Sequence, residues 1–416
     1  MLWGLSRTLR LEHPEIPCRV IDIDPGDGDA MLSADALTAL TRGLNGHSPR
    51  ESVWRGNQCY VPSLASHEYA IRARQSAAVS PAAGFYLISG GFGAFGLHLA
   101  HWLIRRGINT LVLMGRSGAG DTARQAITGL EQLGARIGSY AVDVADPEAL
   151  QRAVSHAEAA FGPLTGIIHG AGILRGGWLS HAGGAAHYET LRPKVVGAMN
   201  LHAITRQRPV AEFILISSAS SVLGLSRYAG YAAANAYLDA LAWMRRGAGL
   251  PALSIGFGPF SDAGMALSEP SLVNSTCLPA LTMAEGIQWL SRALDAGAAH
   301  LIAMAYAAPQ PADAASSTPV SSIAAPWRAS QVMDFIRRQA ADLAGCDGHR
   351  LSLRRPLRDA GIDSLTGVEL RNRLQRHFSI PLPVTLLWDY PTLAELAAFI
   401  HERLQMTYSY GENCNE

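Results

Sequence analysis

The 416-residue sequence lacks the features that mark secreted, membrane-spanning or nucleic-acid-binding proteins. Its five cysteines are scattered and include no Cys-x-x-Cys pair, so neither a disulfide framework nor a zinc site is predicted. No apolar run approaches membrane-spanning length, and the N-terminus has no signal-peptide pattern. Basic and acidic residues number 34 each, a balance that gives no support to nucleic-acid binding. We therefore expect a cytoplasmic protein with no metal, no nucleic-acid partner and no membrane partner.

The length and a hydrophobic content of 48% indicate two or three folded units and exclude wholesale disorder. Composition and periodicity divide the chain into a partial α/β unit at 1–70, a large α/β domain at 71–306, an Ala/Pro/Ser-rich linker at 307–328, a small helical bundle at 329–405 and a polar tail at 406–416. In the first segment we expect a strand at 18–24, a helix at 34–44 and a β-hairpin at 52–62.

The large domain alternates continuous apolar runs with amphipathic helical stretches. Continuous apolar runs are typical of parallel strands that are buried on both faces. The predicted strands lie at 85–89, 110–114, 137–143, 166–169, 212–217 and 251–255. This pattern predicts an α/β fold with a doubly wound parallel sheet of the Rossmann type.

A glycine-rich motif follows the first of these strands and precedes a helix. The motif reads Gly91-Phe92-Gly93-Ala94-Phe95-Gly96. In this context glycines let the main chain approach a pyrophosphate, and the helix N-terminus supplies amide donors. The alternative is a tight strand–helix turn without a ligand. The strand and helix on either side favour a dinucleotide site that includes Gly91, Phe92, Gly93 and Gly96.

The residues after the second predicted strand indicate which dinucleotide would bind. NAD-binding versions place a carboxylate there, about 20 residues past the glycines, but this sequence has Arg116 and Ser117. An arginine and a hydroxyl suit the extra phosphate of NADP, so we favour NADPH over the alternative of a solvated arginine in a turn. Asp143 and Val144 end the next strand and could hold the adenine, or form a plain helix N-cap.

Several further motifs cover nearly the whole of residues 85–304. They are Gly166-Ile-Ile-His-Gly170-Ala171-Gly172, Leu191-Arg-Pro-Lys194-Val, Ser217-Ser218-Ala and Gly230-Tyr231-Ala-Ala-Ala-Asn235. This region resembles the ketoreductases of modular polyketide synthases, a branch of the short-chain dehydrogenase/reductase superfamily. The resemblance implies that Lys194, Ser218, Tyr231 and Asn235 are the active residues, and that Gly170, Ala171 and Gly172 contact the cofactor.

The chemistry of ketone reduction explains these residue types. Hydride delivery leaves negative charge on oxygen, which needs a nearby acid, and we expect Tyr231 to supply it. Lys194 would favour the ionised phenol and relay protons, and Ser218 would hydrogen-bond the carbonyl oxygen. Asn235 would position lysine or a water. Singly, Tyr231 could cap a helix and Lys194 could be a surface charge. By the resemblance, a lysine upstream of the tyrosine marks the polyketide branch.

Some other positions differ from the pattern of the ketoreductases, and some are expected to have a supporting role around the site. The aspartate pair that marks one alcohol stereochemistry is replaced by Leu174-Arg175-Gly176, and the tryptophan of the opposite class is Leu223 here, so product configuration stays open. Phe260 stands where tryptophan is frequent and would border the nicotinamide. Residues 261–274 would form a lid. We expect His169 to end a strand without a catalytic role.

The C-terminal bundle resembles an acyl carrier protein. The matching stretches are Gly361-Ile-Asp-Ser364-Leu and Leu382-Pro-Val-Thr-Leu-Leu-Trp388-Asp-Tyr-Pro391-Thr. A serine at a helix start is normally an N-cap. Here the resemblance implies a four-helix carrier whose Ser364 bears a covalent 4′-phosphopantetheine, attached by a phosphopantetheinyl transferase. The flexible linker would set the reach of this arm.

Residues 1–70 resemble the end of the structural subdomain that precedes the catalytic half in these ketoreductases. The predicted function is NADPH-dependent reduction of a carrier-bound β-ketoacyl thioester during polyketide or related fatty acid assembly. The predicted partners are an upstream ketosynthase and acyltransferase polypeptide and the missing N-terminal half of the ketoreductase. The alternatives are a non-catalytic carrier and scaffold fragment, and a free-standing short-chain reductase, which the carrier serine argues against.

Overall fold

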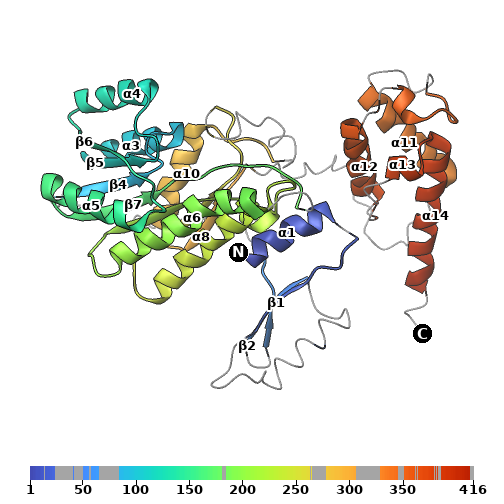
Figure 1. The fold of residues 1–416 in the computed structure, drawn as a ribbon. Helices are drawn as coiled ribbons and strands as arrows, with labels where there is room; N and C mark the ends of the chain where they lie inside the picture. Colours follow the sequence, from blue (N-terminus) through green and yellow to red (C-terminus); the bar gives the residue numbers. More distant parts are fainter. Residues whose placement is uncertain are drawn as a thin grey trace, which may run out of the picture. The chain divides into compact units, whose positions relative to one another are not determined.

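The computed structural model describes residues 1–13, 15–23, 41, 50–55, 58–64, 84–179, 184–262, 264, 278–305, 328–344, 351–360, 362, 364–378, 380, 382 and 386–412. Two compact units divide the chain, Met1–Gln310 and Pro311–Glu416 (Figure 1). All but residue 41 of the helix expected at 34–44, most of the lid at 261–274 and most of the linker at 307–328 lie outside the described residues.

A parallel sheet forms the centre of the first unit. Its strands are β4 (Phe85–Ser89), β5 (Thr110–Gly115), β6 (Arg136–Ala141), β7 (Leu164–His169), β8 (Glu212–Ser218), β9 (Leu253–Phe257) and β10 (His300–Ala303). Among the described residues the strand order is β10-β9-β8-β7-β4-β5-β6, so the winding reverses between β4 and β7. Open α/β sheets bind ligands at such a reversal, outside the carboxyl ends of the strands.

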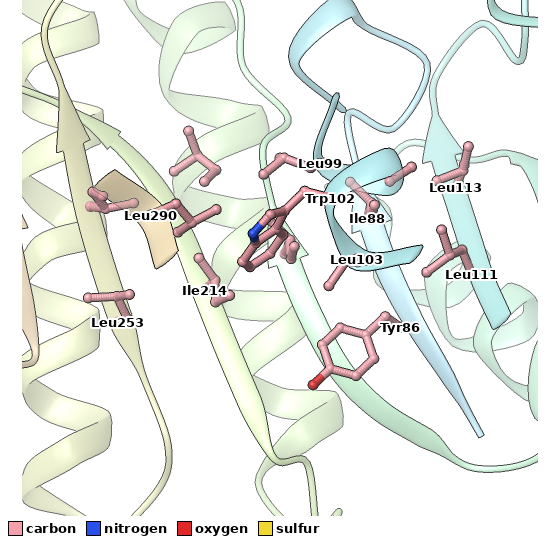
Figure 2. Packing of buried hydrophobic residues seen from close by; sticks show 14 of the residues in the cluster. Tyr86, Ile88, Leu99, Trp102, Leu103, Leu111, Leu113, Ile214, Leu253 and Leu290 are labelled. Atoms are coloured by element: carbon pink, nitrogen blue, oxygen red, sulfur yellow. The ribbon is translucent and has the colours of Figure 1, made fainter. Parts of the chain in front are cut away.

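Helices cover both faces of this sheet (Figure 1). One face packs against α3 (Ala94–Arg105), α4 (Asp121–Gln132) and α10 (Met283–Ala296), and the other against α5 (Pro147–Phe161), α6 (Gly184–Thr205) and α8 (Ala229–Gly247). Leu99 and Trp102 of α3 point toward Ile88 and Ile214 of the sheet (Figure 2). The doubly wound fold predicted from the sequence is confirmed.

The N-terminal residues of the first unit add a helix and a small sheet. Helix α1 (Leu2–Glu12) packs on α8 and on the short α7 (Ser220–Leu223). Strand β1 (Val20–Ile23) pairs in parallel with β2 (Glu51–Arg55), which pairs antiparallel with β3 (Gln58–Tyr60). The expected strand and hairpin are therefore present. Helix α1 was not predicted from the sequence.

The second unit is a small helical bundle with its own core. Its helices are α11 (Ala329–Ala344), η2 (Leu357–Ala360), α12 (Ser364–Phe378), α13 (Leu386–Asp389) and α14 (Leu393–Glu412). Leu370 and Leu374 of α12, Ile336 of α11 and Leu396 of α14 are fully buried together. This arrangement matches the predicted carrier bundle.

The observed strands keep close to the expected positions, with shifts of one or two residues at their ends. Strand β10 was not predicted, because its four residues begin with a histidine and carry too short an apolar run to stand out. None of the described helices is long and apolar enough to cross a membrane.

Candidate active site

The glycine motif forms a tight turn between β4 and α3. Gly90 adopts φ +72°, a conformation that favours glycine. An added Cβ on Gly96 would lie 2.3 Å from the Gly90 carbonyl oxygen, and one on Gly91 would lie 2.9 Å from the Ile88 carbonyl oxygen. Only glycine fits at these positions. The turn therefore brings the N-terminus of α3 to the carboxyl end of β4, as the motif predicted.

The strand ends next to this turn carry Arg116, Ser117 and Asp143. Arg116 and Ser117 follow β5 directly and are exposed, and within the described part of the chain Arg116 makes no hydrogen bond or ion pair. Asp143 accepts a hydrogen bond from the Ala145 main-chain nitrogen at 2.9 Å and forms an ion pair with Arg192 of α6. Arg192 was overlooked in the sequence analysis, although it lies inside one of the quoted motifs. The pairing could not be found from spacing because it joins two separate elements.

The loop after β7 lies against the glycine turn. An added Cβ on Gly90 would lie 2.9 Å from the Ala171 nitrogen, and one on Gly172 would lie 2.8 Å from the Lys194 Cε. The Gly170 nitrogen also donates to the Ser89 carbonyl oxygen at 2.9 Å. The structure therefore brings Gly170, Ala171 and Gly172 together with the glycine motif and with Lys194. Val144 is buried against α6, and its carbonyl oxygen accepts a hydrogen bond from the Asn200 side chain at 3.0 Å.

Lys194 is the only lysine among the 416 residues, the other basic residues being arginines. It lies on α6, is 2% exposed, and donates from Nζ to the Ile216 carbonyl oxygen at 2.8 Å. Its Nζ lies 5.7 Å from the centroid of the Tyr231 ring. Burial lowers the pKa of Lys194 to about 8, with a smaller opposing effect from Asp239.

Tyr231, Ser218 and Asn235 come together from β8 and α8. Asn235 is fully buried, and its Nδ2 donates to the Tyr231 carbonyl oxygen at 2.8 Å, one helical turn back. Burial raises the pKa of the Tyr231 phenol, and hydrogen bonding with the Asn235 and Ser218 side chains opposes that rise. Burial is the larger effect, so the pKa of the phenol is raised overall, and Lys194 does not contribute the depression expected from the sequence.

His169 links the strand ends from beneath the site. It is fully buried, and its Nδ1 lies 2.6 Å from the Ser89 Oγ, while its Nε2 lies 3.4 Å from the Lys194 carbonyl oxygen. Burial lowers the pKa of His169 to about 3, so the ring is neutral at physiological pH. Its place at the end of β7 agrees with the structural role expected for it.

Three other residues named from the sequence flank this site. Arg175 forms an ion pair with Glu189 at 2.9 Å. Leu174 packs against Leu225 and Tyr228, the pair that Tyr231 also packs against. Phe260 packs against Phe95 and Phe257, with ring centroids 5.3 and 5.4 Å away. Within the described residues, no three His, Cys, Asp or Glu side chains gather in a way that could hold a metal ion.

In the second unit, Ser364 is the first residue of α12. Ile362, two residues earlier, is 3% exposed and joins the bundle core, which anchors the chain immediately before the helix. The side chain of Ser364 lies outside the described part of the structure. The main chain therefore places the candidate attachment serine at a helix start, as the sequence predicted.

Comparison with known proteins adds to this geometry. Residues 84–262 match the model of the KR domain, and residues 334–400 match that of the phosphopantetheine attachment site. The chain is 32% identical over 98% of its length to "Polyketide synthase GfsA" of Streptomyces halstedii, of which it covers 6%. It is 33% identical over 97% of its length to "Pikromycin polyketide synthase component PikAIII" of Streptomyces venezuelae, of which it covers 28%. The chain belongs with the polyketide synthases, with a ketoreductase domain followed by a carrier region.

Solved structures agree with this placement of the ketoreductase. The structure described as "Structure of A-type Ketoreductases from Modular Polyketide Synthase" is similar with a TM-score of 0.63 and 29% identity, over 73% of this chain and 63% of that chain. "The first ketoreductase of the tylosin PKS" gives a TM-score of 0.63 and 29% identity over 74% and 65%. The ketoreductase domain makes the chain an oxidoreductase, and its carrier region takes a phosphopantetheine group. The chain spans only a small part of the curated relatives.

Proposed function

We propose that this chain reduces a β-ketoacyl thioester, carried on the phosphopantetheine arm of Ser364, to the β-hydroxyacyl thioester with NADPH. The observation that carries the proposal is the meeting of Lys194, Ser218, Tyr231 and Asn235 beside the glycine turn. These four side chains come from α6, β8 and α8. They lie at the carboxyl ends of the parallel strands, where doubly wound sheets bind ligands.

The residues around the glycine turn fit a nicotinamide dinucleotide. The close packing of Gly91 and Gly96 excludes side chains and leaves the main chain at the N-terminus of α3 accessible to a pyrophosphate. Arg116 and Ser117 are exposed at the end of β5, where they would hold the additional phosphate of NADP. Asp143 and Val144 would border the adenine. When bound, the nicotinamide would supply a hydride to the ketone carbon.

Tyr231 would give its proton to the ketone oxygen as that oxygen becomes an alkoxide. Its raised pKa keeps the phenol protonated at neutral pH, which is the form an acid needs. The Ser218 hydroxyl would donate a hydrogen bond to the same oxygen. Lys194, held by the Ile216 carbonyl oxygen, would carry positive charge near the phenol and favour its loss of a proton.

Asn235 would complete the site from within α8. Its Oδ1 is buried and has no hydrogen-bond partner among the described residues. A buried amide oxygen of this kind is costly unless a donor reaches it, so a water or the Lys194 ammonium is the partner that we propose in the working enzyme. Such a contact would connect the phenol to a proton source.

The carrier would deliver the substrate without adding contacts to the pocket. Attachment through Ser364 raises the effective concentration of the β-ketoacyl group near the reductase. The partners are then the phosphopantetheinyl transferase that loads Ser364 and an upstream ketosynthase and acyltransferase. The curated relatives are much longer than the matched region, which supports the presence of further synthase domains as partners.

The deciding experiment measures NADPH oxidation by the purified chain with a soluble β-ketoacyl thioester surrogate. We expect turnover by the wild type and loss of about 10²-fold or more in Tyr231→Phe, since the proton donor is removed. Tyr237→Phe is the matched control, because Tyr237 lies on the same helix and also has a pKa raised by burial. A folded, NADPH-binding wild type without turnover would instead favour the scaffold alternative.

A further inference from the structure

Helix α1 touches the main chain on both sides of Tyr231. Arg7 donates from its guanidinium to the Ser221 carbonyl oxygen at 2.5 Å, and Thr8 Oγ1 accepts from the Leu225 nitrogen at 3.2 Å. An added Cβ on Gly4 would lie 2.3 Å from the Ala232 carbonyl oxygen. These contacts span the segment that begins after Ser218 and ends at the first turn of α8.

Glu12, the last residue of α1, joins two loops that border the candidate site. We call residues 174–179 and 225–228 the rim loops. The Glu12 carboxylate is 4% exposed and accepts from the Leu179 nitrogen at 2.8 Å and from the Arg227 nitrogen at 2.6 Å. Hydrogen bonds to an ionised acceptor are stronger than neutral ones. One buried charge therefore holds both rim loops.

The second rim loop contains a strained residue at the place that Glu12 holds. Arg227 adopts φ +70°, and it is the one non-glycine residue with positive φ in the described part of the chain. Its nitrogen is bound by Glu12, and its carbonyl oxygen accepts from the Gly177 nitrogen of the other rim loop at 2.7 Å. Such backbone strain persists only where the surroundings fix it, and it is concentrated at functional sites.

The second rim loop packs against the candidate acid, and the first rim loop packs against the second. Leu174 of the first loop and Leu225 and Tyr228 of the second form one apolar cluster with Tyr231. Gly176 also lies against Tyr228, where an added Cβ would be 3.0 Å from its ring. A shift of either loop would therefore move the surroundings of the phenol and of the carbonyl it serves.

We propose that Glu12 is a positioning residue that holds the two rim loops around Tyr231 and so shapes the thioester side of the pocket, an inference that rests on the proposed ketoreduction. The nucleotide side stands on other elements, namely the glycine turn and the ends of β5 and β6. Loss of the Glu12 carboxylate therefore affects thioester turnover and leaves NADPH affinity unchanged.

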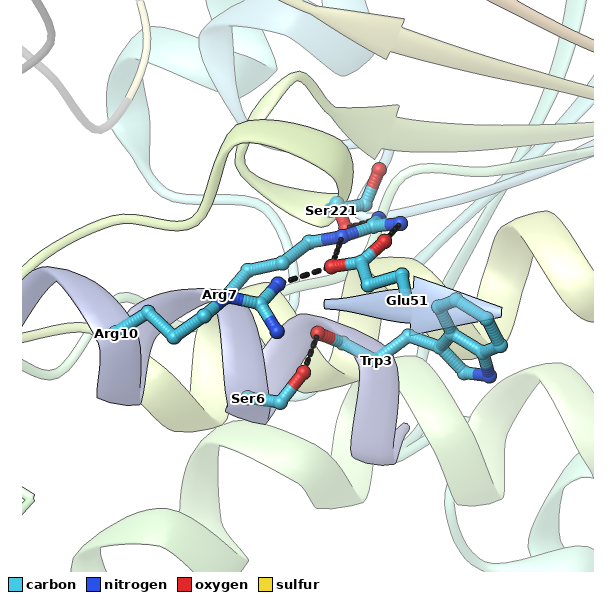
Figure 3. A network of polar contacts seen from close by, with 6 residues as sticks. All are labelled: Trp3, Ser6, Arg7, Arg10, Glu51 and Ser221. Carbon is cyan, nitrogen blue, oxygen red and sulfur yellow. Dashed lines mark hydrogen bonds and ion pairs between the residues drawn. The ribbon is translucent and has the colours of Figure 1, made fainter. Parts of the chain in front are cut away.

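A second carboxylate at α1 provides the matched control. Glu51 of β2 binds Arg7 at 2.5 and 2.9 Å and also pairs with Arg10 (Figure 3). Its side chain is 11% exposed, and hydrogen bonds from the two arginines lower its pKa despite the opposing effect of burial. Glu51 attaches α1 to the small sheet, whereas Glu12 attaches it to the rim loops.

The test compares Glu12→Gln with Glu51→Gln in the full chain. In Glu12→Gln the amide NH₂ group faces one of the two main-chain N–H groups that the carboxylate accepts from, so one of these hydrogen bonds is lost. We expect kcat/KM for the thioester surrogate to fall about tenfold or more, because a small displacement of groups around a reacting centre slows the reaction strongly. NADPH affinity should stay within about twofold in both variants, and Glu51→Gln should keep thioester kinetics within the same margin. Hydrogen exchange at the Leu179 and Arg227 amides should accelerate in Glu12→Gln alone.

Each outcome decides the proposal. Wild-type thioester kinetics and amide protection in Glu12→Gln would overturn it, as would equal losses in both variants or a parallel loss of NADPH binding. If Glu12→Gln does not fold, Thr8→Val removes the acceptor of the Leu225 nitrogen and should give a smaller change of the same kind. Should the wild type itself show no turnover, the ketoreduction fails, while the amide exchange still reports whether Glu12 holds the loops.

Discussion

The two units of this chain build their functional groups in opposite ways. The ketoreductase unit gathers its candidate site from residues between Gly91 and Asn235, on strands and helices that meet at one edge of the sheet. The carrier unit presents Ser364 at the start of α12, with the supporting core formed by neighbouring helices. In the first unit chemistry depends on packing between distant segments. In the second the proposed modification depends on a short local sequence around one serine.

This difference explains why a change near the first site spreads and a change near the second does not. Lys194 lies against Gly172 and Ile216, and its helix carries the arginine that pairs with Asp143. We therefore expect a movement of any of these segments to alter the proposed proton donor and the proposed nucleotide site together. An alteration of Ser364 should remove only the proposed attachment point, because the core residues of the bundle lie on other positions.

Replacing Ser364 by alanine should give the largest effect and separate the two units most cleanly. We expect Ser364→Ala to gain no phosphopantetheine from coenzyme A and a phosphopantetheinyl transferase, because the attacking hydroxyl is gone. Intact-mass measurement checks this result. Reduction of the soluble thioester surrogate should stay within about twofold of wild type, since the two sites are independent.

Ser352→Ala is the control for that experiment. Ser352 is an exposed serine of the same unit whose hydroxyl accepts from the Arg354 and Arg355 nitrogens at 3.3 Å. It should be loaded as wild type is. Loading of Ser364→Ala, or a large loss of its surrogate turnover, would contradict the separation of the two units.

The same contrast governs what the sequence could predict. The glycine turn is local, so its residues and their context predicted a dinucleotide site. The carrier motif is local as well, and its resemblance to carrier proteins implied the attachment serine. The ion pair of Asp143 with Arg192 and the contact of His169 with Ser89 join residues 49 and 80 positions apart. Such pairs depend on strand order, which periodicity does not give. Helix α1 was not predicted, because its polar residues Ser6, Thr8 and Glu12 are buried against main-chain groups instead of marking a solvent-exposed face.

The nucleotide end of the reductase offers the next largest effect. We expect Arg116→Ala to raise KM for NADPH about 10- to 100-fold, because a charge-assisted hydrogen bond to the phosphate contributes about 1.5–3 kcal/mol. Activity with NADH should change little, so the expected preference for NADPH over NADH should become smaller. Steady-state kinetics with both cofactors measure it.

Arg124→Ala is the matched control for Arg116→Ala. Arg124 is an exposed arginine on α4 that pairs with Asp121. Its loss should leave both cofactors unaffected. An equal change in the two variants would indicate a general charge effect, and an unchanged KM in Arg116→Ala would argue against the phosphate contact.

The smallest expected effect is the pH dependence of activity that comes from the single lysine, Lys194. It reports on the ketoreductase unit alone, because the carrier unit contains no lysine. Protein labelled with ¹³C only at lysine Cε should give one signal that titrates near the pKa of about 8 set by burial, instead of the ordinary 10.5. Since the ammonium is the active form, kcat/KM should fall by about half at pH 8 and continue to fall above it, while the phenol of Tyr231 remains protonated.

The same shift fixes the sign of the stability effect. Between about pH 8 and 10.5 the unfolded chain keeps the lysine proton that the folded chain has released. The contribution of Lys194 therefore raises the free energy of unfolding as pH increases through this range. Lys194→Arg, which loses the labelled signal and cannot titrate, should lack the kinetic decline near pH 8 in its residual activity. A labelled lysine that titrates near 10.5 in the folded protein would show that Nζ is hydrated, and the buried contact with the Ile216 carbonyl oxygen would then not describe the free enzyme in solution.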